Sequence, residues 1–434
     1  MAEAQDLTRP RPAVVRRPAA RPRPPAVERR LAALAALLCA AAALDPDALS
    51  QRYRNWSYYP DWVIEPLCMN PGCNQTSQCN TAQKRPGSPF AGCFSDCFSL
   101  VQLPREAAAG VFRAFYLQWD GVGYETYSAR TTDMVHFDTS DPTLAPGQPG
   151  VVFSPRAGRP PLGDAKPAEG DFDFGGAAFI GPLVADYNVT ATRVLQRAAN
   201  ESLWYAYFAQ PTRPGLEPPP GADGFAASAD GLNWRRAAAR PFLDVDPAHG
   251  AKAWESGQIY APFVAPAPGG ALAVFYNAVG NNSAGKHTEE SGQAYLDGGA
   301  AALPGVGADG ASLWRRDARN PTLPNNALGT SMASDPKIYF DAQQGVWVMI
   351  YFCYGGTKTG GACICAAFSD DQVSWAPAST PLYVNGGHPN GLDKCHAHKA
   401  WLTGDGKTDR LYLYYTADSC HQGRGIALLT STPL

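Results

Sequence analysis

The chain has 434 residues and a formal net charge of −3, with 11% aromatic and 17% charged residues, 43 glycines and 39 prolines. Many turn-forming residues, many aromatics and few charges indicate an all-β fold. Beyond the N-terminus no cluster of lysine and arginine is interleaved with aromatics, so we expect no nucleic-acid partner.

Residues 1–45 are expected to form a targeting segment. Its first 30 residues are basic and proline-rich, and they lead into the apolar run Leu31–Leu44. This run is shorter than the ~20 apolar residues that a membrane-spanning helix needs, and it follows a basic flank, as in a signal peptide. The segment therefore predicts a secreted protein or one in the lumen of the secretory pathway. Two alternatives stay open: a type II signal anchor, which would be the only attachment to a membrane, and an organelle transit peptide.

Residues 46–92 form a Cys-rich segment, and five cysteines fall within Cys68–Cys97. Such a stretch has little apolar material for a core, so we expect disulfides to hold it. A zinc site is the competing interpretation, but no histidine lies nearby and the spacings lack paired CxxC motifs. Sequons for N-glycosylation also favour the secretory route. They begin at Asn55, Asn74, Asn188, Asn200 and Asn281.

Residues 93–434 contain a unit that recurs with loops of varying length. Each unit has an aromatic, β-branched strand, and the first four end in a short turn that closes on an aromatic residue. The aromatic strands are expected at 113–119, 203–210, 272–279, 346–354 and 410–417, and the closing aromatics are Phe137, Trp234, Trp314 and Trp375. Repeats of this kind predict a five-bladed β-propeller. A β-sandwich or two stacked β-domains are the alternatives.

The strand before each aromatic strand is expected to line the propeller axis. These innermost strands are predicted at 94–102, 174–184, 255–264, 334–340 and 396–402. Ionisable residues stand at or near the start of several of them. They are Asp96, Glu255, Asp335 and the group His396, His398 and Lys399, while Asp173 comes just before the second strand. Taken singly, each acid is more often a turn or cap residue, but carboxylates converging from separate blades would suit glycoside hydrolysis, which needs a pair of them.

Several strings carry a resemblance to a known family. They are FYLQWDGVGYETYSARTTDMVHF, WESGQIYAPF, SDPKIYFDAQQGVWVMIYF and GGHPNGLDKCHAHKAWL. The region from Cys93 to Leu434 resembles bacterial glycosyl hydrolases related to glycoside hydrolase families 43, 32 and 68. The resemblance implies a glycosidase in which Asp96 is the base or nucleophile, Glu255 the general acid and Asp335 an acid that orients the sugar. Ser334 takes the place of the arginine that precedes this aspartate in invertase-like enzymes.

Further residues are expected to bind a carbohydrate substrate. They are Asp120, Asp173, Trp254, Tyr260, His396, His398, Lys399 and Arg424. We expect no required cofactor. The resemblance implies a calcium or sodium ion near the axis, and His398 is placed to hold it; a buried, hydrogen-bonded core histidine is the competing interpretation.

Two other functions remain open on the same fold. A glycoside phosphorylase or transferase would need cations facing the acids, which Lys399, His396 and Arg424 would supply. A non-catalytic carbohydrate-binding propeller would use the same aromatic residues. No GxSxG or HExxH motif occurs, so a serine hydrolase or a metalloprotease of those types is not expected. Cys395 and Cys420, which flank the first two strands of the last unit, are predicted to form a disulfide.

Overall fold

The computed structural model describes residues 44–66, 94–119, 124–140, 150–154, 172–173, 176–209, 221–281, 287–323, 332–354, 361–419, 423–432 and 434. Its contacts divide the chain into Met1–Leu44 and Asp45–Leu434. The basic leader and most of the Cys-rich segment lie outside the described residues, so the expectations for them stay predictions. Among the residues that are described, none belongs to a helix long and apolar enough to cross a bilayer.

The described chain is mostly β and forms successive antiparallel runs of strands. The first is β2 (Phe94–Val101), β3 (Phe112–Trp119), β4 (Tyr124–Thr131) and β5 (Val151–Phe153), and the second is β6 (Ala177–Pro182), β7 (Leu203–Ala209), β8 (Ala222–Ser228) and β9 (Arg235–Arg236). The third is β10 (Gln258–Pro266), β11 (Leu272–Asn281), β12 (His287–Leu296) and β13 (Arg315–Arg316). The fourth is β14 (Met332–Asp341), β15 (Val346–Tyr354), β16 (Ala362–Ser369) and β17 (Ala376–Pro377), with β18 (Tyr383–Val384) also paired to β16. The last is β19 (His396–Gly404), β20 (Leu411–Asp418), β21 (Arg424–Thr430) and β1 (Ser57–Tyr58).

The helices in the described ranges are short, and they precede the first strand or lie between strands. They are α2 (Pro46–Ser50), η1 (Gln51–Tyr53), α3 (Pro104–Ala107), η3 (Pro247–His249), η4 (Ala253–Glu255), η5 (Pro268–Gly270) and η6 (Gly299–Ala302). The aromatic strands predicted from the sequence correspond to β3, β7, β11, β15 and β20. The fold class is therefore all-β, as expected.

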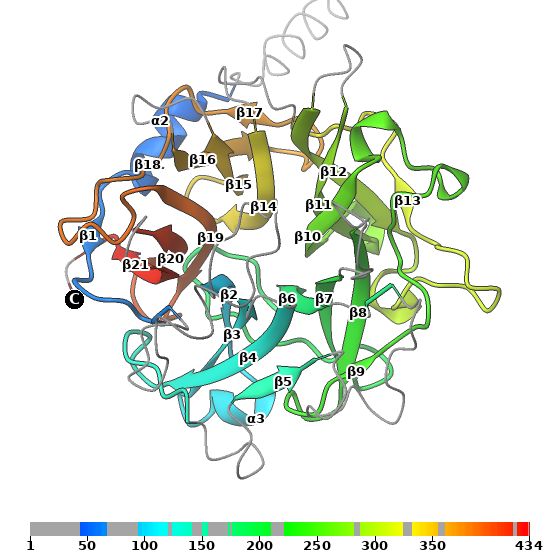
Figure 1. The fold of residues 1–434 in the computed structure, drawn as a ribbon, viewed down its shortest axis with the longest axis horizontal. Helices are drawn as coiled ribbons and strands as arrows, with labels where there is room; N and C mark the ends of the chain where they lie inside the picture. The colour runs from blue at the N-terminus through cyan, green and yellow to red at the C-terminus, as the bar shows by residue number, and fades with distance from the viewer. Residues whose placement is uncertain are drawn as a thin grey trace, which may run out of the picture. The chain divides into compact units, whose positions relative to one another are not determined.

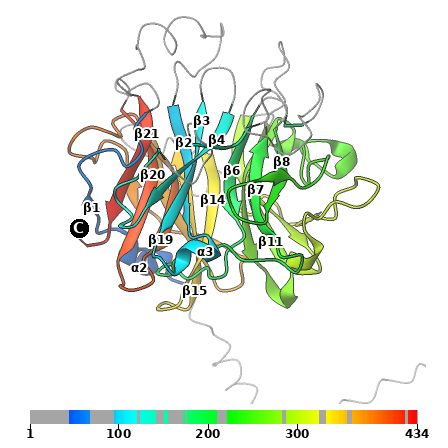
Figure 2. The ribbon, with the colours of Figure 1, turned by 90° about the horizontal axis from the view of Figure 1, so that it is seen from below.

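The first strands of the successive runs surround a common centre (Figure 1). Strand β2 contacts β6, β6 contacts β10, β10 contacts β14, β14 contacts β19, and β19 contacts β2 again. A ring that closes in this way is the arrangement of a propeller, and a sandwich of two sheets would not produce it. Figure 2 shows the strands from the side, with α3, which follows β2, near their lower ends.

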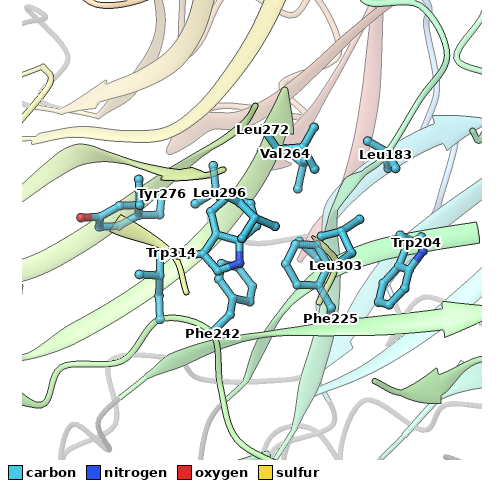
Figure 3. Packing of buried hydrophobic residues seen from close by; sticks show 14 of the residues in the cluster. Leu183, Trp204, Phe225, Phe242, Val264, Leu272, Tyr276, Leu296, Leu303 and Trp314 are labelled. Atoms are coloured by element: carbon cyan, nitrogen blue, oxygen red, sulfur yellow. The ribbon is translucent and has the colours of Figure 1, made fainter. Parts of the chain in front are cut away.

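Neighbouring runs are joined by apolar side chains (Figure 3). Between the second and third runs, the aromatic rings of Phe225, Phe242 and Trp314 lie within 4.4 to 5.9 Å of one another. Trp204 and Leu296 belong to the same buried cluster. Because each sheet buries both faces against its neighbours, the middle strands are apolar on both sides, which explains their continuous aromatic and aliphatic sequence.

Four innermost strands contain the same local irregularity near their first residues. The pairing register shifts at this point in β2, β10, β14 and β19. One residue in each shift has a positive φ: Cys97 (50°), Ala261 (57°), Asp335 (54°) and Lys399 (51°). A bulge inserts an extra residue and changes the direction of the side chains around it. A positive φ is strained for residues other than glycine, and such strain gathers at functional sites.

The N-terminal part of the described chain completes the last run. Ser57 pairs with Thr430 and Tyr58 with Leu429, and Ile64 forms a bridge to Ile426. The Tyr53 hydroxyl donates to Asp341 Oδ2 at 2.5 Å. The described part of the segment that we expected to precede the propeller, residues 46–66, is therefore packed on the strand runs.

Three of the four turns that close on an aromatic residue, those before Phe137, Trp234 and Trp375, share one hydrogen-bond pattern. Asp133, Asp230 and Asp371 each accept two backbone N–H groups, two and three residues further on, at 2.7 to 2.9 Å. A serine or threonine two residues earlier donates its hydroxyl to the same carboxylate. At Asp230, burial would raise the pKa of the carboxyl, but these donors outweigh it and lower the pKa to about 2. The carboxylate fixes the turn and so places Trp234 in the core.

We expect Asp230→Ala to lower the free energy of unfolding by roughly 1–2 kcal/mol, the usual effect of removing such a cap. Asp309→Ala is the matched control, because a single N–H donor, that of Ala311, is found on Asp309 in the described chain, and it should cost less. Urea denaturation measures both changes. Equal losses for the two variants would contradict this explanation of the turn.

Candidate active site

Asp96 lies near the start of β2 and is almost completely buried, with 1% of its surface exposed. Lys399 Nζ donates to its Oδ2 at 2.7 Å, and Thr416 Oγ1 donates to its Oδ1 at 2.7 Å. Arg424 Nη1 lies 3.6 Å from the same Oδ2. The backbone N–H of Cys97 also donates to Oδ1 at 2.8 Å. The last run of strands therefore surrounds an acid of the first.

These contacts keep Asp96 ionised. Burial alone would raise the pKa of Asp96, but the charge of Lys399, helped by Arg424, outweighs it and holds the pKa well below the usual range. In Lys399, burial would lower the pKa, but Asp96 outweighs that effect and raises it. The pair is thus a carboxylate and an ammonium at neutral pH.

Glu289, on β12, is a second buried acid, and the pattern of innermost strands did not point to it. Ser334 Oγ and Asn277 Nδ2 both donate to its Oε1 at 2.7 Å. Burial raises the pKa of Glu289 to about 7, with a contribution from the charge of Asp335, against the opposing effects of Ser334 and Lys399. At neutral pH it therefore holds a proton much of the time.

Asp335 and its neighbours connect the two acids. Asp335 Oδ1 accepts a hydrogen bond from Lys337 Nζ at 2.6 Å, and both residues are buried. Lys399 acts electrostatically on both Asp96 and Glu289, and Asp335 acts on Glu289 and on Cys97. The structure thus brings Asp96, Asp335, Lys399 and Glu289 to the end of the ring where β2, β12, β14 and β19 begin, opposite α3 in Figure 2.

Glu255 was expected to begin an innermost strand, and this placement is wrong. Strand β10 begins at Gln258, and Glu255 is the last residue of the short helix η4, where its Oε2 accepts the N–H of Lys252 at 2.9 Å and so caps the start of the helix. Its Oε1 accepts from Tyr276 Oη at 2.5 Å and from Arg316 Nε at 3.1 Å.

Glu255 and Glu289 lie on opposite faces of the third run. Their partners, Tyr276 and Asn277, are consecutive residues of β11. Successive side chains of a strand point to opposite faces of the sheet. The Tyr276 ring belongs to the cluster packed against the second run, whereas Glu289 bonds to Ser334 of the fourth. Glu255 is therefore held apart from the acids of the axis.

Two other candidates, Asp173 and Trp254, make contacts that stabilise the fold. Asp173 is fully buried, 3.0 Å from Arg236 Nη1, and accepts from Tyr207 Oη at 3.0 Å. Trp254 is buried and stacks on Tyr276 with ring centroids 6.1 Å apart. Asp120 lies outside the described residues, so its expected role stays a prediction.

The remaining candidates lie near the acid cluster. His398 Nδ1 lies at hydrogen-bonding distance, 3.2 Å, from the Thr416 carbonyl oxygen, and burial lowers the pKa of its ring well below the usual value. Burial also lowers the pKa of His396. Tyr260 Oη lies 3.5 Å from Ser334 Oγ.

Aromatic rings border these residues on one side. Phe94 and Phe208 are buried in a cluster against which Trp119, Tyr124 and Tyr260 pack partly exposed. The charges of Lys399 and Asp96 act electrostatically on Tyr124, so these rings lie beside the ion pair. Flat, partly exposed rings next to paired charges provide both an apolar face and polar groups for a ligand.

Three cysteines of the fourth run lie close together. Within the described residues, one group brings three candidate metal ligands close together, and it consists of Cys353, Cys363 and Cys365. Cys353 lies within bonding distance of both others, with Cα–Cα distances of 5.1 and 6.1 Å, and it can bond only one at a time. Thiolates are poor ligands for calcium. Cys395 is disulfide-bonded, while its predicted partner Cys420 lies outside the described residues.

Comparisons with known proteins bear on the fold. No protein-family model and no curated protein matches the chain. Among solved structures, a complex of BT0996 with RGII is similar with a TM-score of 0.66 and 20% identity, covering 89% of this chain and 95% of that one. A "Glycoside hydrolase" has a TM-score of 0.64 and 21% identity, covering 90% and 96%. At these identities the likeness shows the fold, and it confirms at that level the expected resemblance to propeller glycoside hydrolases.

The Asp96–Lys399 pair can be tested directly. Lys399→Met should lower the free energy of unfolding by roughly 3 kcal/mol, because it leaves a buried carboxylate without its main counter-charge. The double variant Asp96→Asn/Lys399→Met should recover part of this loss.

Arg315→Met is the control. Arg315 Nη2 lies 4.0 Å from Asp297 Oδ1 in an exposed ion pair, so this substitution should change the free energy of unfolding by less than about 1 kcal/mol. Urea denaturation measures these variants and the single variant Asp96→Asn. If the double variant lost the sum of the losses of Lys399→Met and Asp96→Asn, the two groups would not be coupled.

Proposed function

We propose that this protein is a glycoside hydrolase built on a five-bladed propeller, with Asp96 as the ionised base or nucleophile and Glu289 as the general acid. One observation carries the proposal: at one end of the axis Lys399 holds the buried Asp96 ionised, while burial, helped by the charge of Asp335, raises the pKa of Glu289 to about 7. Glycoside hydrolysis requires this division between two carboxyl groups.

Each proposed role follows from the surroundings of the residue. Glu289 would give its proton to the departing glycosidic oxygen, and the charge of Asp335 favours the protonated state that this step needs. Asp96, whose charged form Lys399 and Arg424 favour, would either take a proton from the attacking water or bond to the anomeric carbon as the glycosidic bond breaks, in which case water then releases the sugar. Both routes use only the carboxyl groups, the sugar and water, so we propose that no cofactor is required.

A phosphorylase is less well supported than a hydrolase. It would need cations to hold phosphate, and the candidates were Lys399, His396 and Arg424. Lys399 and Arg424 both interact with Asp96, and the lowered pKa of His396 favours its uncharged ring. The cationic charge near the acids is thus used to keep Asp96 ionised.

We propose a carbohydrate substrate whose terminal units bind beside Trp119, Tyr124 and Tyr260. One structurally similar protein, BT0996, forms a complex with RGII, so oligosaccharides from RGII are the first substrates to test, together with aryl glycosides. We further propose that the protein acts in the secretory pathway or outside the cell, which the disulfide at Cys395 supports.

Glu289→Gln should reduce kcat/KM by about 10²- to 10⁴-fold, because the amide keeps the shape of the side chain but cannot donate a proton in the same way. Glu255→Gln is the matched control and should retain most turnover per folded molecule. Initial rates on the best aryl glycoside of the screen measure both. The opposite ranking would restore Glu255 as the general acid, and sugar binding without hydrolysis by the unaltered protein would favour a non-catalytic binding propeller.

The pH dependence of kcat/KM should follow the titration of Glu289. Since its pKa is raised to about 7, the protonated form dominates below this pH, and kcat/KM should fall about tenfold per unit above it. Between pH 4 and 6 it should stay nearly level, because the pKa of Asp96 is well below its usual range and Glu289 stays protonated.

Ser334→Ala provides the control for this assignment. The Ser334 hydroxyl donates to Glu289 and lowers its pKa, so its removal should move the alkaline fall to higher pH. A fall that does not move in this variant would assign the titration to another group.

A further inference from the structure

A cavity lies away from the axis, at the seam between the first run of strands and the N-terminal segment. Its volume is about 530 Å³, within the usual range of small-ligand sites. The walls come from residues 59–66, from β3 and β4, and from the turn 135–139.

The cavity and the acids lie on opposite faces of β2. Ser95 Oγ donates to the Glu65 carbonyl and lies 3.5 Å from Gln118 Nε2, and both partners line the cavity. The next residue, Asp96, faces Lys399. Because successive side chains of a strand point to opposite faces, a glycosyl unit in this cavity cannot also lie between Asp96 and Glu289.

The lining combines flat rings with hydrogen-bonding groups. Tyr59, Trp62 and Tyr127 are half-buried, and Tyr127 stacks on the buried Tyr116 with ring centroids 6.0 Å apart. Gln118 is 91% buried, since 9% of its surface is exposed, and within the described part of the chain its Oε1 has no hydrogen-bond partner. A buried carbonyl oxygen without a donor is costly. Because Gln118 lines the cavity, a rotation of its amide would bring this oxygen to a ligand hydroxyl.

From these observations we propose that the cavity is a second carbohydrate-binding site, which holds a glycosyl unit against the Trp62 and Tyr59 rings with a sugar hydroxyl donating to Gln118 Oε1. Sugars present apolar C–H faces and hydroxyl groups at once, which matches rings beside an amide. The site extends the proposed function, on which it rests for its role: it would anchor a polysaccharide chain while another part of that chain reaches the axis.

The test uses the full chain carrying Glu289→Gln, so that bound sugar is not turned over. Its electrophoretic retardation is measured in native gels that contain arabinan, rhamnogalacturonan or mixed-linkage β-glucan. We expect retardation by at least one polymer, and Trp62→Ala should weaken the apparent affinity about tenfold, as expected from losing one ring contact. Gln118→Leu should weaken it as well while preserving the volume of the side chain.

Tyr58→Ala is the matched control, because Tyr58 is exposed beside Tyr383, does not line the cavity, and should leave retardation unchanged. Thermal melting checks that each variant is folded. Retardation by none of the polymers, or retardation that survives both Trp62→Ala and Gln118→Leu, would overturn the proposal. In the protein with Glu289 intact, Trp62→Ala should retain kcat/KM on a small aryl glycoside, so a missing second site is distinguishable from a missing activity.

Discussion

The buried ion pair between Asp96 and Lys399 joins the first strand of the ring to the first strand of its last run. Two charges taken out of water are stable only when they meet each other and further donors, which Thr416 and Arg424 provide here. The pair therefore constrains two things together. It holds the ends of the ring in register, and it fixes the charge at the end of the axis where the other acids lie.

The protonation of Glu289 follows from that arrangement. Glu289 is buried and accepts two hydrogen bonds from uncharged groups, while Asp335 adds negative charge nearby. Asp96 is equally buried but faces two cations. Two carboxyl groups in one low-dielectric region thus take different charge states because their partners differ. The strained bulges at Cys97, Asp335 and Lys399 turn the innermost strands where these side chains must meet.

The sequence predicts the repeating parts of this structure better than its particular ones. Each aromatic strand is buried on both faces, and three of the four closing turns are fixed by an aspartate that accepts two backbone N–H groups, so both leave local patterns that hold in the structure. Asp96, Asp335 and Lys399 were predictable because they stand at the same point of innermost strands. Glu289 reaches the cluster from the third strand of its run, and the only available signal was a pair of glutamates in HTEESGQAYL. Glu255 is misleading because its carboxylate caps a short helix, which no strand pattern distinguishes.

The pairing of β1 with β21 has a consequence for folding during synthesis on the ribosome. A ribosome makes residues 57–58 and Asp96 early, and their partners on β19, β20 and β21 come last. The earlier strand runs can pack while the chain is still growing, but the ring cannot shut until residue 430 has emerged. During synthesis the propeller is therefore only partly assembled and has two open edges. A chain truncated before β21 would retain both open edges.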